Sequence, residues 1–158
     1  MSIAGKSKRS TTNDLRQNVA GRLLALDLGK KRVGIAISDE MWITVRPLAP
    51  LHRTNWKELV HAVADLVQRF DAGGLVIGLP LNLDGSEGEA AKEARKNGLN
   101  FELSLKIPVY LQDERLTSRE AEESLRAAGC SDREVREHVD SHAASIILRD
   151  FIALHSSP

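Results

Sequence analysis

Three acidic positions carry the strongest chemical signal in the sequence. Asp27 interrupts an apolar run that begins at Leu23, where an acid is costly unless it is paired, hydrogen-bonded or bound to a cation. Glu114, with Asp113 before it, follows the apolar run IPVYL, and Asp140 stands at the expected start of the last helix. Carboxylates that meet at one end of a sheet repel one another unless a cation lies between them, and such hard oxygen ligands suit Mg²⁺ or Mn²⁺. Ions of this kind could activate a water for hydrolysis of a phosphodiester.

Each of these acids also has a purely structural interpretation. Asp27 could cap the turn that follows its strand. Asp113 and Glu114 could pair with Arg115, and Asp140 could be a favourable acid in the first turn of a helix. Each acid alone is weak evidence for a metal site. The metal site is favoured because all of these acids fall at the ends of expected strands or helices.

The elements that must position the acids follow from apolar spacing and from turn residues. The sequence predicts these elements in order: a hairpin over 23–38, an edge strand over 43–51, a helix from Thr54 or Asn55 to Phe70, a strand over 75–79, a helix through 90–101 and a strand over 107–111. Gly73 and Gly74 are expected to end the first of these helices. Further helices are expected over 117–129, from Ser131, and from Val139 onward. A strand, a crossover helix and a strand predict parallel pairing, so the fold class is α/β.

Length and charge bound the domain organisation. The 158 residues suit one domain with a net charge of zero, so charge alone identifies no partner. Residues 1–21 carry four basic residues against one acid, a net charge of +3, and are expected to form a disordered basic tail before a single domain at 22–158. A solvated extension is favoured over a nucleic-acid tether. Cys130 is the only cysteine, which excludes an internal disulfide and favours the cytoplasm. No apolar run is long enough for a membrane span.

Four motifs together give a family resemblance. They read ALDLGKKRVGIAIS, VIGLPLNLDGSEG, QDERLTSREAE and VDSHAASIIL, in this order. With them the chain resembles the YqgF/RuvX family, which is similar to the RuvC resolvases, over about residues 22–155. The resemblance implies an RNase H-like fold: a mixed five-stranded sheet with helices on both faces. It also implies a nuclease that uses Mg²⁺ or Mn²⁺, with Asp27, Glu114 and Asp140 as catalytic and metal-binding residues.

The second acid departs from the RuvC pattern. RuvC-like enzymes carry it on the strand that here reads LVIGLP, which contains no acid. Glu114 must then reach in from the neighbouring strand, or Asp113 takes the role. The resemblance implies processing of the 5′ end of precursor 16S ribosomal RNA (pre-rRNA), with Holliday junction resolution as the alternative. Junction resolution requires two symmetric cuts, so it would favour a homodimer.

Residues expected to contact the substrate lie beside the acids in the sequence. Lys30, Arg32 and Arg115 are expected to hold phosphates, because cationic side chains position a nucleic-acid backbone without reading its sequence. Asn82 and Asp84, in the long loop over 80–88, could orient substrate or a metal-bound water; a plain loop with Ser86 capping the next helix is the alternative. Aromatic residues are 4% of the chain, which favours recognition of shape and backbone over base stacking.

Two other functional classes fit parts of the sequence. The first motif also resembles the phosphate loop of actin-like ATPases and sugar kinases, but the chain is too short to supply their second domain. A non-catalytic nucleic-acid-binding module is the other class, and the presence of all three acids argues against it.

Overall fold

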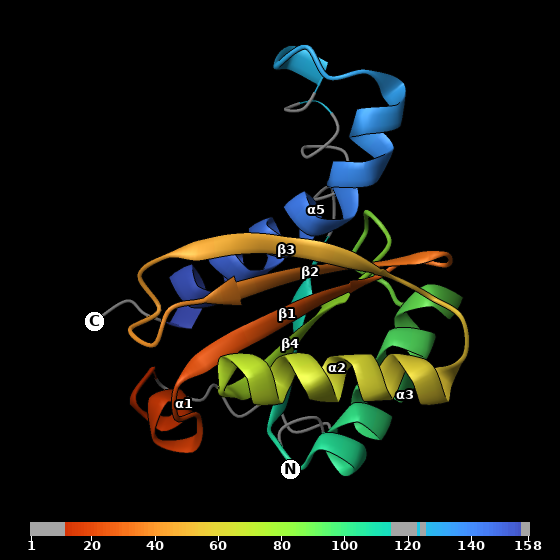
Figure 1. The fold of residues 1–158 in the computed structure, drawn as a ribbon. Coiled ribbons are helices and arrows are strands. Elements are labelled where there is room, and N and C mark those ends of the chain that lie inside the picture. Colours follow the sequence, from red (N-terminus) through yellow and green to blue (C-terminus); the bar gives the residue numbers. More distant parts are fainter. Residues whose placement is uncertain (1–11, 115–122, 124–125, 156–158) are drawn as a thin grey trace.

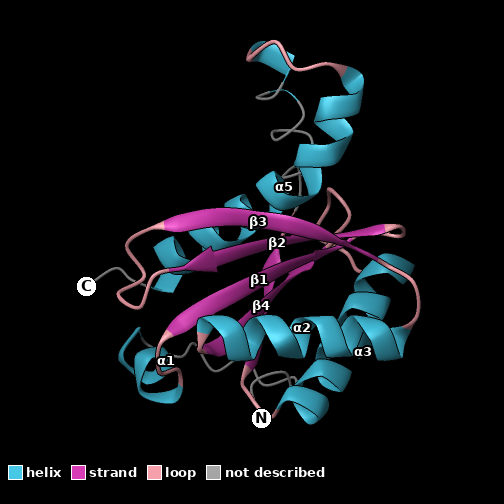
Figure 2. Cartoon of the chain, in the orientation of Figure 1, coloured by secondary structure: helices cyan, strands magenta, loops and turns pink. Residues whose placement is uncertain are grey.

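The centre of the molecule is a five-stranded sheet. The structure, a computed structural model, describes residues 12–114, 123 and 126–155, without the side chains of 12–14 and 132–141. The strands are β1 (Arg22–Leu28), β2 (Arg32–Ser38), β3 (Val45–His52), β4 (Ala72–Leu79) and β5 (Val109–Asp113), in the spatial order β3-β2-β1-β4-β5 (Figures 1 and 2). β1 pairs antiparallel with β2 and parallel with β4, and β4 pairs parallel with β5. This is the mixed sheet of the expected RNase H-like fold. The carboxyl ends of β1, β4 and β5 therefore meet at one edge.

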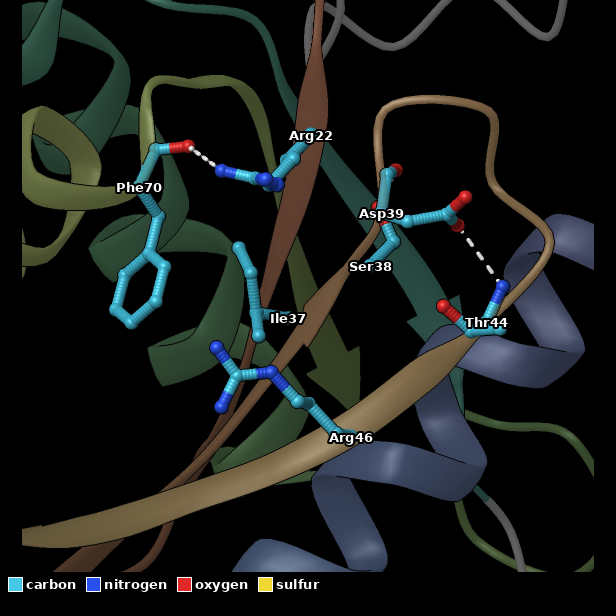
Figure 3. Close-up of a pocket in the computed structure, with 7 residues that line it drawn as sticks. All are labelled: Arg22, Ile37, Ser38, Asp39, Thr44, Arg46 and Phe70. Atoms are coloured by element: carbon cyan, nitrogen blue, oxygen red, sulfur yellow. Dashed lines mark hydrogen bonds between the residues drawn. The ribbon is translucent and has the colours of Figure 1, made fainter.

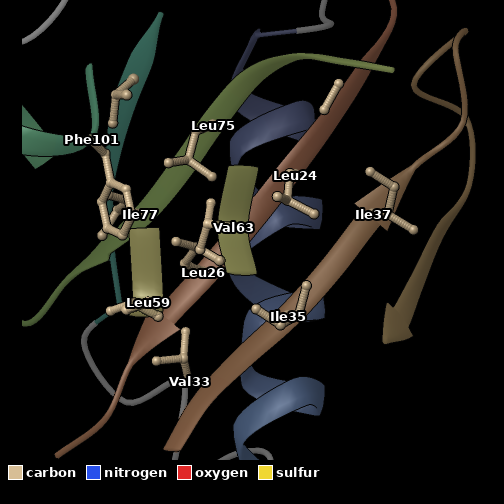
Figure 4. Close-up of a cluster of buried hydrophobic side chains, with 12 residues drawn as sticks. Leu24, Leu26, Val33, Ile35, Ile37, Leu59, Val63, Leu75, Ile77 and Phe101 are labelled. Atoms are coloured by element: carbon tan, nitrogen blue, oxygen red, sulfur yellow. The ribbon is translucent and has the colours of Figure 1, made fainter. Parts of the chain in front are cut away.

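Helices cover both faces of the sheet, as expected. α2 (Trp56–Phe70) and α3 (Glu89–Leu105) pack on one face against inward residues such as Leu24, Leu26 and Ile77 (Figure 4). α1 (Thr12–Asn18) and α5 (Asp132–His155) pack on the other, against Leu23 and Ala25. Successive side chains of a strand point to opposite faces, so Asp27 lies on the α5 face with Leu23 and Ala25. None of the described helices combines the length and apolar character needed to span a membrane.

Several element boundaries differ from the sequence prediction. Those of α2 agree: it begins after Asn55, whose side chain accepts the N–H of Glu58 at 2.9 Å, and ends at Phe70, followed by Asp71 in the left-handed conformation. The prediction that Gly73 and Gly74 end this helix is wrong, because both lie in β4. Glycine is required at 73 for packing, since a Cβ there would overlap the carbonyl oxygen of Ala20. β5 begins and ends two residues later than the predicted 107–111.

The last helix is continuous. A short helix from Ser131 and a separate one from Val139 were expected, but α5 runs unbroken from Asp132 to His155. No glycine or proline interrupts residues 132–155, which explains the continuity. Asp140 is therefore an interior residue of α5, and the interpretation of Asp140 as a first-turn acid is wrong. Most of the helix predicted over 117–129 lies outside the described residues.

The disordered tail was predicted over residues 1–21, but its C-terminal part is folded. Residues 12–18 form α1, and Leu15 and Val19 are buried in the core on the α5 face. The Arg16 guanidinium lies 4.6 Å from the centroid of the Trp42 ring, and Trp42 Nε1 donates to the Gly21 carbonyl at 2.9 Å. Two apolar residues four apart are too weak a periodic signal to predict such a helix. Residues 1–11 of the expected tail lie outside the described residues.

Replacing Leu15 tests whether α1 belongs to the folded domain. Leu15→Ala is expected to lower the free energy of unfolding by about 2–3 kcal/mol, because it removes a buried side chain from a packed core. The exposed Gln17→Ala in the same helix should change it by less than about 0.5 kcal/mol. Urea unfolding followed by circular dichroism measures both. Equal, small effects would show that α1 does not contribute to the core.

Candidate active site

Asp27 occupies an open position near the carboxyl end of β1. It pairs with Gly34 across the antiparallel ladder to β2. On the other side Leu26 pairs with Ile77 of β4, so in the same register Asp27 lies beside Gly78. Side chains at neighbouring positions of paired strands normally contact one another. Glycine on both neighbouring strands leaves space around the Asp27 carboxylate on the α5 face.

Glu114 lies on the same face as Asp27. Its N–H donates to the Leu79 carbonyl at 3.1 Å, which continues the β4–β5 pairing one residue past β5. Tyr110 packs in the core on the α5 face and Leu111 packs on the opposite face. Alternation therefore directs Glu114 to the α5 face and Asp113 away from it. The sequence left the choice between these acids open, and the geometry favours Glu114.

The Glu114 side chain reaches across β4 toward Asp27. A Cβ built on Gly78 would overlap Glu114 Oε2 and lie 2.8 Å from Glu114 Cδ. The Glu114 carboxyl therefore rests over Gly78, the residue beside Asp27. This contact brings the acid that follows β5 next to an acid from β1, although β1 and β5 are not neighbours in the sheet.

The environment of Glu114 favours its protonated form. Four causes together raise the pKa of the Glu114 carboxyl from 4.5 to about 9: burial, which is the largest, then the charge of Asp27, a hydrogen bond to Asp27 and the charge of Asp113. Glu114 Oε2 is buried without a hydrogen-bond partner among the described atoms. A buried carboxyl oxygen without a partner is costly, and two adjacent carboxylates repel. A hard divalent cation would satisfy both groups, so the donors fit Mg²⁺ or Mn²⁺.

The third predicted acid is placed by its backbone alone. Asp140 lies in α5 at the spacing that puts it on the same helical stripe as Ala144 and Ile147, which are buried against the sheet. Its side chain is outside the described set, and Arg115 lies outside the described residues altogether. Among the side chains that are described, no three of His, Cys, Asp or Glu gather in a metal-binding cluster.

The predicted phosphate contacts Lys30 and Arg32 lie where β1 turns into β2. Lys30 is exposed in the turn and Arg32 begins β2. Arg53, which the sequence analysis did not identify, supports this turn. Its backbone N–H donates to the Lys31 carbonyl at 2.8 Å and its Nη1 to the Gly29 carbonyl at 3.0 Å. No sequence pattern distinguishes this arginine from other charged residues, because its role depends on a contact between segments distant in the chain.

Asn82 and Asp84 shape the loop that follows β4. Asn82 Nδ2 donates to Ser86 Oγ at 2.9 Å, and the Ser86 backbone N–H donates to Asp84 Oδ1 at 2.8 Å. Ser86 does not cap α3, because Gly88 is the N-cap residue and has no side chain to do so. The loop leaves the carboxyl end of β4, the same sheet edge as Asp27 (Figure 1). Both side chains are exposed at that edge.

A pocket lies at the other end of the sheet. Its volume is about 230 Å³, and it is lined by Arg22, Ile37, Ser38, Asp39, Thr44, Arg46 and Phe70 (Figure 3). Arg22 Nη1 donates to the Phe70 carbonyl at 3.1 Å, and the Thr44 N–H donates to Asp39 Oδ1 at 2.8 Å, which lowers the pKa of Asp39. None of the predicted site residues lines this pocket.

Comparison with known proteins gives consistent matches. Residues 21–154 match the model of the RuvX family, described as Holliday junction resolvase. A candidate pre-16S rRNA nuclease from Anaeromyxobacter sp. (strain K) is 43% identical over 131 residues, covering 83% of this chain and 96% of the relative. A protein of the same name from Lactobacillus acidophilus is 40% identical over 138 residues, covering 85% and 97%. Among solved structures, Thermus thermophilus RuvC in complex with a Holliday junction aligns at 15% identity with a TM-score of 0.48, covering 84% and 94%.

Proposed function

The chain belongs to the RuvX family, and from that membership we propose that it is a divalent-metal-dependent nuclease acting on structured nucleic acid. Asp27, Glu114 and Asp140 would be its catalytic, metal-binding acids. The observation that carries the proposal is the buried Glu114 Oε2, which has no described hydrogen-bond partner and belongs to a carboxyl beside Asp27. A structural acid would normally have such a partner.

The site residues would have different roles in phosphodiester hydrolysis. Asp27 and Glu114 would hold Mg²⁺ or Mn²⁺, which when bound supplies positive charge that assists attack on the phosphorus. Glu114 must release its proton to become a ligand, so binding of the cation competes with protonation at this carboxyl. Lys30 and Arg32 would hold the phosphate backbone beside the acids. Asn82 and Asp84, in the loop that follows β4, would orient the substrate.

The proposed substrate is pre-rRNA, with cleavage at the 5′ end of 16S rRNA. Support comes from the curated relatives, which are named candidate pre-16S rRNA nucleases and align along nearly their whole length. The family description favours a second candidate, a four-way DNA junction. Resolution of a junction would require paired cuts and so favours a homodimer.

One comparison of substrates tests this proposal. End-labelled precursor 16S RNA and a mobile four-way DNA junction are incubated with the same preparation, with Mg²⁺, with Mn²⁺ and with EDTA. Cleavage of the RNA alone, dependent on metal, is the expected result. Symmetric cleavage of the junction by a dimer would support the second candidate. If either substrate is bound but neither is cleaved in Mg²⁺ or in Mn²⁺, the protein is not a nuclease.

Removing Lys30 tests the phosphate contact. Lys30→Ala is expected to weaken binding of nucleic acid and to reduce the slope of log affinity against log salt by about 1, because one phosphate contact releases about one counterion. Arg69→Ala is the matched control, because it removes an exposed cation from the last turn of α2, outside the proposed site. Fluorescence anisotropy over a range of salt concentrations measures both. An equal loss of slope in the two variants would argue against a specific role for Lys30.

A further inference from the structure

Gly78 lies in β4, between β1, which carries Asp27, and β5, which Glu114 directly follows. β1 and β5 flank β4, so their backbones are two strand spacings apart, about 9–10 Å. Carboxylates on the nearest positions of such strands do not meet unless one side chain crosses the strand between them. The Glu114 side chain makes this crossing directly over Gly78.

We propose that Gly78 is a positioning residue of the site: its missing side chain forms the notch in which the Glu114 carboxyl lies beside Asp27. The inference rests on the proposed function only in taking this pair to hold a metal. A Cβ at position 78 would overlap Glu114 Oε2 and lie 2.8 Å from both Glu114 Cδ and Ile147 Cδ1. Real Cβ atoms essentially never make contacts this close, so both the Glu114 carboxyl and the end of the Ile147 side chain have to shift.

Glu114 is the group expected to leave its place, whereas Ile147 is expected to shift only at Cδ1, the end of its side chain. Ile147 is fully buried in the core between α5 and the sheet, where close packing resists displacement. Glu114 lies past the last residue of β5 and is partly exposed, and its buried carboxyl gains solvation when it leaves the notch. Gly78→Ala should therefore turn the Glu114 carboxyl away from Asp27, with only a small adjustment of Ile147 in the core.

The first test is independent of catalysis. Crystal structures of the metal-free wild type and of Gly78→Ala are compared at Glu114. The expected result is a Glu114 carboxyl beside Asp27 in the wild type and displaced from it in the variant. A Gly78→Ala structure in which the Glu114 carboxyl keeps its place beside Asp27 would overturn the proposal.

The second test measures metal binding and turnover. Gly78→Ala is expected to weaken Mn²⁺ binding, measured by calorimetry, by about 10–100-fold and to lower kcat similarly, with KM for nucleic acid nearly unchanged. Gly74→Ala is the matched control in the same strand, because a Cβ there meets the ends of the Leu23 and Val19 side chains, far from the acids. Equal Mn²⁺ affinity in the wild type and Gly78→Ala would overturn the role of Gly78.

A double-mutant cycle separates positioning from general disruption. In a Glu114→Ala background, Gly78→Ala is expected to cause no further loss of Mn²⁺ affinity, because the group it displaces is already absent. Additive losses would show that Gly78 acts otherwise than through Glu114. A wild type that binds no Mn²⁺ and cleaves nothing would contradict the proposed nuclease, while the crystal comparison would still decide whether Gly78 positions Glu114.

Discussion

Asp27→Asn is expected to lower metal-dependent cleavage by several orders of magnitude, with the fold and the affinity for nucleic acid retained. The amide has nearly the shape of the carboxylate but lacks the charge that holds a divalent cation. The amide fills the same volume as the carboxylate, and Gly34 and Gly78 flank the position, so the substitution creates neither a clash nor a cavity. Single-turnover cleavage in Mg²⁺ and in Mn²⁺, with binding measured in EDTA, checks both parts of the prediction.

Asp65→Asn is the control for this substitution. Asp65 is an exposed carboxylate on α2, which covers the opposite face of the sheet from Asp27. The same change of charge there should leave cleavage at the wild-type rate. Normal cleavage by Asp27→Asn would refute the assignment of Asp27, whatever the control shows.

Glu114→Gln is expected to abolish cleavage and to stabilise the metal-free protein at neutral and alkaline pH. The pKa of Glu114 is raised from 4.5 to about 9 in the folded protein, so between these values the folded state holds a proton that the unfolded state has lost. The stability this proton confers is fully present below about pH 4.5 and is lost as pH rises toward 9, at up to about 1.4 kcal/mol per pH unit. A neutral amide has no proton to lose, so the variant should lack this decline.

Urea unfolding in EDTA between pH 5 and about pH 9 measures the effect. The wild type should lose stability across this range, by several kcal/mol more than Glu114→Gln does. Mn²⁺ should restore wild-type stability at the upper end, because the cation binds the deprotonated carboxyl. Asp113→Asn is the matched neighbour: it removes the smallest of the causes that raise the pKa of Glu114, so most of the decline and the cleavage should remain. Parallel pH profiles for wild type and Glu114→Gln would contradict a buried, proton-holding Glu114.

The sequence predicted the architecture well because the relevant signals are local. Two apolar runs around a short polar turn predicted the β1–β2 hairpin, and Pro47 and Pro50 predicted that β3 lies at an edge, as it does. The helix between the hairpin and β4 predicted the parallel pairing, which brings the ends of β1, β4 and β5 to one edge. That topology is why acids more than eighty residues apart, Asp27 and Glu114, meet.

What the sequence could not predict depends on contacts between distant segments. Leu15 is apolar, but the sequence alone does not show that it is buried, because the core that it joins is formed by residues distant in the chain. Gly73 resembles a helix terminator, yet its role is to admit the Ala20 carbonyl. The choice of Glu114 over Asp113 depended on how far β5 extends: the predicted strand ended before both residues, and alternation could be applied only once the strand was seen to reach Asp113.

The central claim is that the carboxylates of Asp27 and Glu114 together bind a divalent cation, and a crystal structure of the protein soaked with Mn²⁺ tests it most directly. The anomalous difference map is predicted to show a peak within bonding distance of oxygens from both side chains, at the sheet edge where β1 and β5 end. A peak elsewhere, or no peak at this pair at a pH where Glu114 is ionised, would contradict the account.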